Sequence, residues 1–209
     1  MIRRTRTVFL ALALLLSGCA SLPDEPPQEY YADKKIPVPS GDEFTFCSQY
    51  GCKLQTPLSF SAQDWADIYD FYGSPAQDAA GERAKIAQTI GFLERKIGPR
   101  TGTDKDIAGT FRKIGKGQLD CVDESTNTTT YLLLMDGKGL LKFHTVGSPD
   151  TRFPIIHAGR WPHQTAVIID KETKIPYAVD SWFHDNGYPA EIITLESWKE
   201  GWKPDDLWR

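Results

Sequence analysis

The first half of the chain carries apolar residues at helical spacing. Ser61 and Asp64 have the pattern of a helix N-cap, and a helix is expected to begin after Ser61. A second helix is expected over about 79–97, where Ile, Leu and Ala recur at the same spacing, and Gly98-Pro99 is expected to stop it. The apolar face of the first helix is expected to hold Trp65, Ile68, Tyr69 and Tyr72, with Gly73, Ser74 and Pro75 after its end.

The pattern changes to strands in the second half. Segments 163–170 and 175–183 are rich in β-branched and aromatic residues, and shorter strands are expected over 142–146 and 192–195. Residues 98–117 hold many Gly, Lys and Thr residues and are expected to form a loop with at most one short helix. Helices first and strands later predict an α+β domain in which N-terminal helices pack on an antiparallel sheet.

The first 18 residues have the pattern of an export signal. Three arginines lie among the first six residues, and the apolar run from Val8 to Leu16 is too short to span a bilayer as a helix. Leu16-Ser17-Gly18-Cys19 resembles the bacterial lipobox, which implies cleavage before Cys19 and acylation of that cysteine, as with palmitate. The alternative is an ordinary secretory signal with an incidental cysteine. Ala20 favours the outer over the inner membrane, by resemblance to known lipoproteins.

Composition divides the remainder into two parts. Residues 19–43 have the Pro-rich, charged composition of a lipidated tether, which leaves 44–209 as one domain in the cell envelope on the periplasmic face. Without residues 1–18 the chain has 21 basic and 28 acidic side chains, a formal net charge of −7. Such a balance is unlike that of a nucleic-acid binder. The expected partners are the membrane, through the lipid, and a protein or peptide substrate.

Three cysteines remain beside Cys19. Cys47 and Cys52 lie close together, and an exported compartment is oxidising, so a disulfide is expected between them. Such a pair also occurs in metal sites, although the sequence has no second pair to complete one. Cys121 is left over, either as a reactive thiol or as a buried, inert one.

Cys121 is expected to be the first residue of a helix, because Asp120 is a good N-cap residue and Asp123 completes a capping box. Free N–H groups at a helix start favour a thiolate, whereas Asp120, Asp123 and Glu124 disfavour it, so a cationic partner is needed. The alternative is that residues 129–135 form a strand, since Asn127-Thr-Thr-Thr is a poor helix interior.

His163 is the best partner among the four histidines, because it opens a strong strand whose neighbour carries an acid. In an antiparallel hairpin with Asp170 opposite Ile175, His163 lies opposite Trp182. Asp180 is then its diagonal neighbour, within side-chain reach. A slip of one residue would put Asp180 on the other face of the sheet.

Cys121, His163 and Asp180 together supply the parts of a hydrolytic triad. The imidazole takes the thiol proton and later protonates the leaving amine, while the carboxylate fixes the tautomer of the ring. Backbone N–H groups at the helix start, with Gln118 as a candidate side-chain donor, would hold the oxyanion. This chemistry needs no cofactor.

The order of these residues resembles the transglutaminase-like, papain-like superfamily, and within it the bacterial transglutaminase-like cysteine proteinases. Three segments carry the resemblance: Asp-Cys-Val-Asp at 120–123, the His163 strand, and Ala-Val-Asp-Ser-Trp at 178–182, with separations of 42 and 17 residues between Cys, His and Asp. The resemblance covers residues 60 to 200. It implies a transglutaminase-like (papain-like) core and a periplasmic cysteine peptidase that hydrolyses amide bonds.

Other readings stay open. Some members of that family depend on calcium, for which Asp120, Asp123 and Glu124 are candidate ligands, although acids on a first turn are also ordinary helix caps. The same fold suits a non-catalytic envelope lipoprotein that binds or scaffolds, or an amide hydrolase or transferase acting on cell-wall peptide. A zinc site from His144, His157 and His163 lacks the short spacing of typical ligands. The residues expected to line a substrate groove, or else to pack in the core, are Trp161, Trp182, Trp198 and Trp202.

Overall fold

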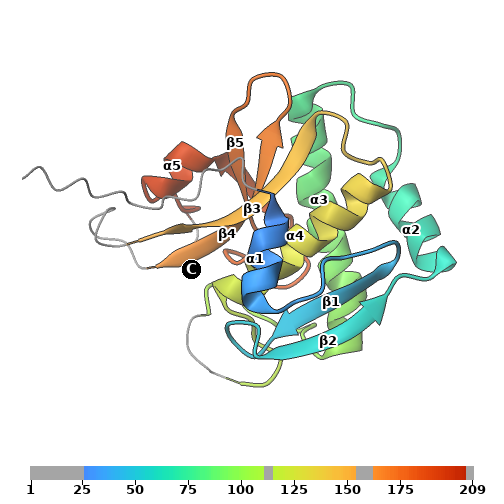
Figure 1. Ribbon diagram of the computed structural model, residues 1–209, viewed down its shortest axis with the longest axis vertical. Coiled ribbons are helices and arrows are strands. Elements are labelled where there is room, and N and C mark those ends of the chain that lie inside the picture. Colours follow the sequence, from blue (N-terminus) through green and yellow to red (C-terminus); the bar gives the residue numbers. More distant parts are fainter. Residues whose placement is uncertain (1–25, 111–114, 154–161, 206–209) are drawn as a thin grey trace, which may run out of the picture.

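The computed structural model describes residues 26–110, 115–153 and 162–205 (Figure 1). These residues form the α+β arrangement that the sequence predicts, with two antiparallel sheets: the hairpin β1-β2, and a four-stranded sheet of order β3-β4-β5-β6. No helix among them is long and apolar enough to cross a membrane. In chain order the elements are α1 Pro27–Lys34, β1 Glu43–Ser48, β2 Leu54–Ser59, α2 Ala62–Tyr72, α3 Ala79–Thr101, α4 Cys121–Gly137, β3 His144–Arg152, β4 His163–Asp170, β5 Pro176–Asp180, β6 Glu191–Thr194 and α5 Leu195–Lys199.

Helix α4 is the central element, between the four-stranded sheet and the β1-β2 hairpin (Figure 1). Its residues from Asp123 to Leu132 are buried, including a run of threonines. Their hydroxyls are satisfied inside the fold: Thr126 and Thr129 donate to the carbonyls four residues earlier, at 2.6 and 2.7 Å. Packing on all sides therefore outweighs the weak helix propensity of this segment, and the alternative of a strand over 129–135 is wrong.

The hairpin of β4 and β5 has the predicted register. Ile169 pairs with Pro176 and Ala166 with Val179, and the N–H of Asp170 donates to the carbonyl of Ile175 at 3.0 Å. β5 ends at Asp180, earlier than predicted, because residues 181–189 turn away before β6. β3 begins at His144 and is longer than predicted, with an irregularity between Gly147 and Asp150.

Both N-terminal helices were predicted, with two differences. Ser61 and Asp64 form the expected capping box at α2, but Tyr69 is 44 % exposed and does not belong to the buried face. α3 continues past Gly98-Pro99 to Thr101. Gly98 is a packing glycine, since a side chain there would lie 2.9 Å from the Asp104 backbone, and the αL residue that ends the helix is Gly102.

The segment expected to be a tether contains helix α1 and packs on the domain. Tyr31 is fully buried, and its hydroxyl bonds to Thr130 of α4 at 2.7 Å. The ordered domain therefore begins before residue 44, a correction to the predicted boundary. The β1-β2 hairpin was not predicted. The disulfide between Cys47 and Cys52 is confirmed, whereas Cys19 lies outside the described residues.

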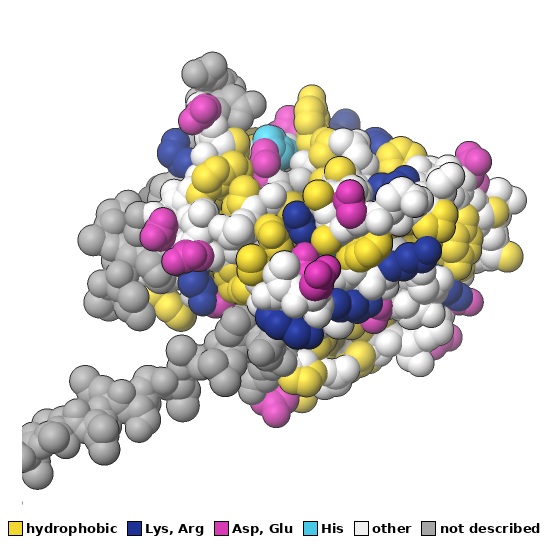
Figure 2. Space-filling model, turned by 90° about the horizontal axis from the view of Figure 1, so that it is seen from above, with side chains coloured by type: hydrophobic (Ala, Val, Ile, Leu, Met, Phe, Trp, Pro, Cys, Tyr) yellow, Lys and Arg dark blue, Asp and Glu magenta, His cyan; other side chains and the backbone are white. Residues whose placement is uncertain are grey.

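Both faces of the four-stranded sheet are covered. Along β4, Ala166 and Ile168 face the larger core beneath α2, α3 and α4, while Val167 and Ile169 face a smaller core. We call this second set the aromatic core; its buried members are Val167, Ile169, Ala178, Trp182, Phe183, Leu195 and Trp198. On the surface seen in Figure 2, the described Lys and Arg side chains are interspersed with Asp and Glu, so basic charge is not gathered there in one patch.

Candidate active site

Cys121 is the first residue of α4, as the capping pattern predicts. The Asp120 carboxylate accepts from the N–H groups of Val122 (3.1 Å) and Asp123 (2.9 Å), and the Asp123 carboxylate accepts from the N–H of Asp120 (3.4 Å). Within the described part of the chain, Cys121 is the cysteine free of a disulfide. It is partly buried and packs against the aromatic core.

His163, Asp180 and Trp198 form one hydrogen-bonded group. His163 Nε2 lies 2.7 Å from Asp180 Oδ2, and the indole N–H of Trp198 donates to the same oxygen, also at 2.7 Å. All three side chains are buried. The pairing of β4 with β5 explains this contact, because in that register His163 and Asp180 share the sheet face of Val167 and Ala178, against which Cys121 also packs.

The imidazole of His163 is held by aromatic rings on several sides. Its centroid lies 4.5 Å from Trp182, 5.2 Å from Phe183 and 5.4 Å from Trp198. Nδ1 is buried and has no hydrogen-bond partner among the described residues, so the thiol and the ring are not hydrogen-bonded to each other in this structure. A buried ring nitrogen without a partner is unusual, and it lies on the sheet face where the thiol packs.

The Cys121 thiol is neutral in this environment. Burial, with the charges of Asp120 and Asp180, raises its pKa to about 12, although the backbone N–H groups of Gln164 and Cys121 itself act to lower it. Burial together with these two acids thus outweighs the N–H groups, and the helix start alone does not make the thiol a thiolate, as the sequence indicates.

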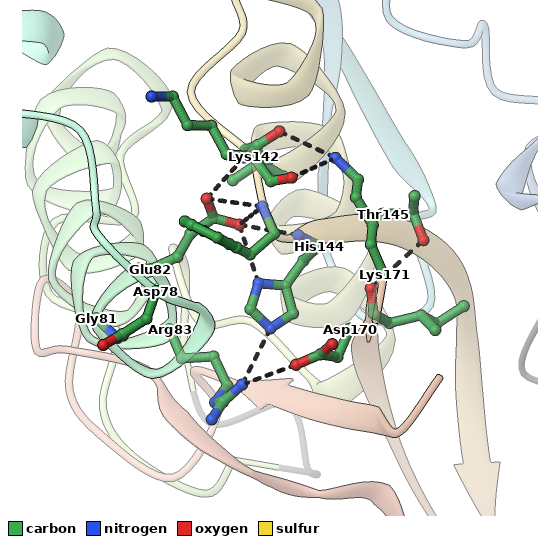
Figure 3. A network of polar contacts seen from close by, with 12 residues as sticks. Asp78, Gly81, Glu82, Arg83, Lys142, His144, Thr145, Asp170 and Lys171 are labelled. Carbon is green, nitrogen blue, oxygen red and sulfur yellow. Dashed lines mark hydrogen bonds and ion pairs between the residues drawn. The ribbon is translucent and has the colours of Figure 1, made fainter. Parts of the chain in front are cut away.

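His144 differs from His163 in that both of its ring nitrogens have partners (Figure 3). Its Nδ1 lies 2.9 Å from Oε1 of Glu82, and its Nε2 lies 3.2 Å from Nη1 of Arg83. Glu82 also accepts from the backbone N–H groups of residues 142–144, and Arg83 pairs with Asp170 at 3.6 Å. Both ring nitrogens of His144 are therefore occupied, in a network that ties α3 to the start of β3 and the end of β4.

Several predicted site residues are engaged elsewhere. Gln118 donates to the carbonyl of Lys105 (2.8 Å) and accepts from the N–H of Ile107 (3.2 Å), which ties its amide to the preceding loop, so the predicted oxyanion role lacks support. Asp123 accepts from three backbone N–H groups, and Glu124 accepts from Ser181 Oγ at 2.7 Å.

Metal sites find little support in these contacts. The carboxylates of Asp120, Asp123 and Glu124 serve different partners, and the described residues hold no group of three or more His, Cys, Asp or Glu side chains that could hold a metal ion. His144 and His163 have their own carboxylate partners. His157 and Trp161 lie outside the described residues.

Two features of the site were not predicted. Trp198, which the sequence predicts to line a groove or pack in the core, donates from α5 to Asp180; only the general need of a buried indole N–H for a partner could have suggested this. The second feature is a pair of buried acids, Glu124 and Asp106, of which Glu124 interacts electrostatically with Asp180. Burial raises the pKa of Glu124, and burial together with the charge of Glu124 raises that of Asp106 to about 9, with a hydrogen bond between the two side chains.

No family model, curated protein or solved structure matches the chain. The resemblance of the motifs to transglutaminase-like proteinases therefore stays a prediction.

Proposed function

We propose that this protein is a cysteine hydrolase of amide bonds that acts on protein or peptide substrates through Cys121, His163 and Asp180. One observation carries the proposal. The buried ring of His163 is bonded to Asp180 at Nε2, while Nδ1 is left without a hydrogen-bond partner among the described residues, on the sheet face where the leftover thiol packs. A histidine with only a structural role would be expected to use both nitrogens, as His144 does.

In this proposal His163 is the general base. Since its Nε2–H donates to the Asp180 carboxylate, the neutral ring keeps its lone pair at Nδ1. A thiol with a pKa of about 12 is protonated at neutral pH, so the proton moves from Cys121 to Nδ1 as the sulfur attacks the carbonyl carbon. Asp180 then stabilises the imidazolium and keeps its orientation.

The remaining steps use the same groups. The tetrahedral intermediate collapses when the imidazolium protonates the leaving amine, and a thioester on Cys121 remains. Water, activated by His163, hydrolyses the thioester and frees the thiol. The backbone N–H of Cys121, at the start of α4, is the proposed oxyanion donor, in place of Gln118.

The transglutaminase-like core, acylation of Cys19 and a location on the periplasmic face of the outer membrane belong to the same proposal. The order of the elements supports the core: helix α4 begins at Cys121, and the paired strands β4 and β5 follow later in the chain. The Cys47–Cys52 disulfide supports an oxidising compartment.

The test is cleavage of defined substrates by the purified protein. A peptide mixture and isolated cell-wall peptides are incubated with it, and new amino and carboxyl termini are identified by mass spectrometry. Cleavage that is lost in Cys121→Ala and in His163→Ala supports the proposal. His184→Ala is the matched control, because His184 also pairs with a carboxylate, Glu191, at 2.8 Å, but outside the triad. Cleavage of wall peptides alone would assign the substrate to the wall, and cleavage unchanged in Cys121→Ala would refute the proposal.

A second candidate, a non-catalytic envelope protein with the same fold, is favoured by one observation. Cys121 and His163 are not hydrogen-bonded here, and burial keeps the thiol neutral. This candidate predicts that neither substrate is cleaved and that Cys121→Ala stays folded and keeps its binding partner.

A further inference from the structure

The loop that joins β1 to β2 is bonded to the first turn of the helix that carries Cys121. The N–H of Tyr50 donates to Oδ2 of Asp123 at 2.7 Å, and the N–H of Cys52 donates to Oδ1 at 2.6 Å. Asp123 is completely buried and is also the acceptor for the N–H of Asp120 in the capping box. The same carboxylate thus joins the loop to the residues on both sides of Cys121.

The loop has an unusual backbone that suits this carboxylate. Gln49, Tyr50, Gly51 and Cys52 have φ values of 66°, 66°, 72° and 59°, all in the left-handed region, although three of the four are not glycine. Successive residues of one hand point their N–H groups in roughly one direction, as at the start of a helix, and this arrangement suits an anion. Here the anion is the side chain of Asp123, and the Cys47–Cys52 disulfide closes the loop around it.

A second contact docks the other end of the loop on the same helix. Asn127, one turn after Asp123, accepts from the N–H of Cys47 at 2.8 Å and donates to its carbonyl at 2.9 Å. Both half-cystines are buried, together with Tyr31 and Ile36. The two ends of the disulfide loop are therefore bonded to positions i and i+4 of α4, and the loop and the first helical turn form one unit.

We propose that Asp123 is a positioning residue for Cys121 and that the Cys47–Cys52 disulfide holds it in place, so that the hydrolase is assembled only where this disulfide forms. The inference rests on the proposed function, because it concerns the placement of the nucleophile. The exported compartment supplies the oxidant as protein disulfides: two thiols lose two electrons and two protons, one S–S bond forms, and the oxidant is reduced to a dithiol. With both thiols free, the protein is folded but inactive.

The physical reason is the cost of an unpartnered buried carboxyl group. Burial and the charge of Asp120 raise the pKa of Asp123 to about 7, and the N–H groups of Cys52, Tyr50 and Asp120 oppose that rise. Without the disulfide, four consecutive left-handed residues are not maintained, and the carboxyl group loses two of its three donors. It then reorients, the capping box opens, and the start of α4 moves with Cys121. A displacement of about 1 Å costs on the order of 100-fold in rate.

The experiment compares Cys47→Ala/Cys52→Ala, Asp123→Ala and Asp123→Asn with the wild type, in the full protein. Hydrolysis and the rate of Cys121 alkylation across pH are measured, with circular dichroism to show that each variant is folded. We expect kcat to fall at least tenfold in the double variant and in Asp123→Ala with little change in KM, and the alkylation profile to shift. Asp123→Asn keeps one acceptor oxygen and is expected to restore part of the activity. Tyr72→Phe, which removes a hydrogen bond to the Leu140 carbonyl beyond the C-terminal end of α4, controls for a general loss of stability.

Wild-type protein is also titrated with dithiothreitol, which breaks the S–S bond and becomes a cyclic disulfide itself. Activity is expected to fall as Cys47 and Cys52 become free, while Cys121 stays a thiol throughout. If the double variant does not fold, this titration and the two Asp123 variants decide. If the wild type is active and the folded variants have the same kcat and the same alkylation profile, this inference is overturned and the proposed function is left intact. Wild type that neither cleaves substrate nor alkylates at Cys121 would overturn both.

Discussion

The indole N–H of Trp198 lies 2.7 Å from Oδ2 of Asp180, the oxygen that also accepts from His163. One carboxylate oxygen thus has two donors, and α5 braces the acid of the proposed triad from outside the sheet. Arg152 extends this support, since its guanidinium stacks on the Trp198 ring at 4.7 Å and donates to the Trp198 carbonyl at 2.8 Å.

Trp198→Phe removes this donor and keeps an aromatic ring in the buried site. A hydrogen bond to a charged group contributes about 1.5–3 kcal/mol, so we expect kcat/KM to fall roughly 10- to 100-fold. The readout is the pH dependence of kcat, because the carboxylate partner of the proposed general base is held less well in the variant, whereas a purely structural loss would not shift the profile. Trp202→Phe is the control for loss of an indole at the rim of the same core. An unchanged profile would remove Trp198 from the site.

Asp120→Asn separates charge from capping at Cys121. Asn caps a helix about as well as Asp, so α4 is expected to keep its start. The Asp120 charge raises the pKa of the thiol, and its removal should therefore lower that pKa and speed alkylation of Cys121 at mildly alkaline pH. Alkylation rates measured across pH, by mass spectrometry at Cys121, check this. A profile that does not move would mean that the Asp120 charge does not contribute to the pKa of the thiol.

Glu82→Gln tests whether the polar network in Figure 3 stabilises the fold, and whether this stabilisation is lost at low pH. Burial raises the pKa of Glu82, but the hydrogen bonds from His144 and the backbone N–H groups of residues 142 and 143 outweigh it and hold the pKa below its ordinary value of 4.5. A depressed carboxyl pKa stabilises the fold above the unfolded pKa, and this stability is lost as the pH falls through the folded value. We expect the free energy of unfolding of the variant to be about 3 kcal/mol lower than that of wild type at neutral pH. This difference is expected to shrink as the pH falls. Urea unfolding at several pH values measures it, with the exposed Glu172→Gln as control.

Asp106→Asn tests a carboxyl group whose contribution to stability falls as the pH rises, the opposite of what is expected for Glu82. The pKa of Asp106 is raised from 3.8 to about 9, so its contribution to stability is complete below the unfolded pKa and is lost as the pH rises toward 9. Asparagine reproduces the neutral acid: its oxygen can accept from the N–H of Leu119, and its amide can donate to Glu124. The melting temperature of the variant should exceed that of wild type near pH 9, and the two melting temperatures should converge as the pH falls toward the unfolded pKa of 3.8. A constant difference at all pH values would contradict a protonated Asp106.

The sequence predicts the parts of the site that depend on local patterns. The capping residues around Cys121 predict the start of α4, and two strand segments rich in β-branched residues with a short connection allow the register that joins His163 to Asp180. These features need only a few neighbouring residues. The same holds for the disulfide, since its two cysteines are five residues apart.

What the sequence does not predict depends on distant packing. The threonines of α4 form a helix only because the hairpin, α1 and the sheet surround them, and Gly98 fails to stop α3 because its missing side chain makes room for the Asp104 backbone. Tyr31 attaches α1 to α4 by a hydrogen bond to a residue 99 positions away. Trp198 reaches Asp180 from an element whose own pattern shows no functional signal.

The most direct test of the triad is the rate at which a peptide electrophile labels Cys121 at neutral pH, compared between wild type and His163→Ala. Since the thiol is neutral at rest, the triad predicts that labelling depends on proton transfer to Nδ1 and falls roughly 100-fold or more in the variant, with His184→Ala unchanged. Equal rates in wild type and His163→Ala would contradict the account.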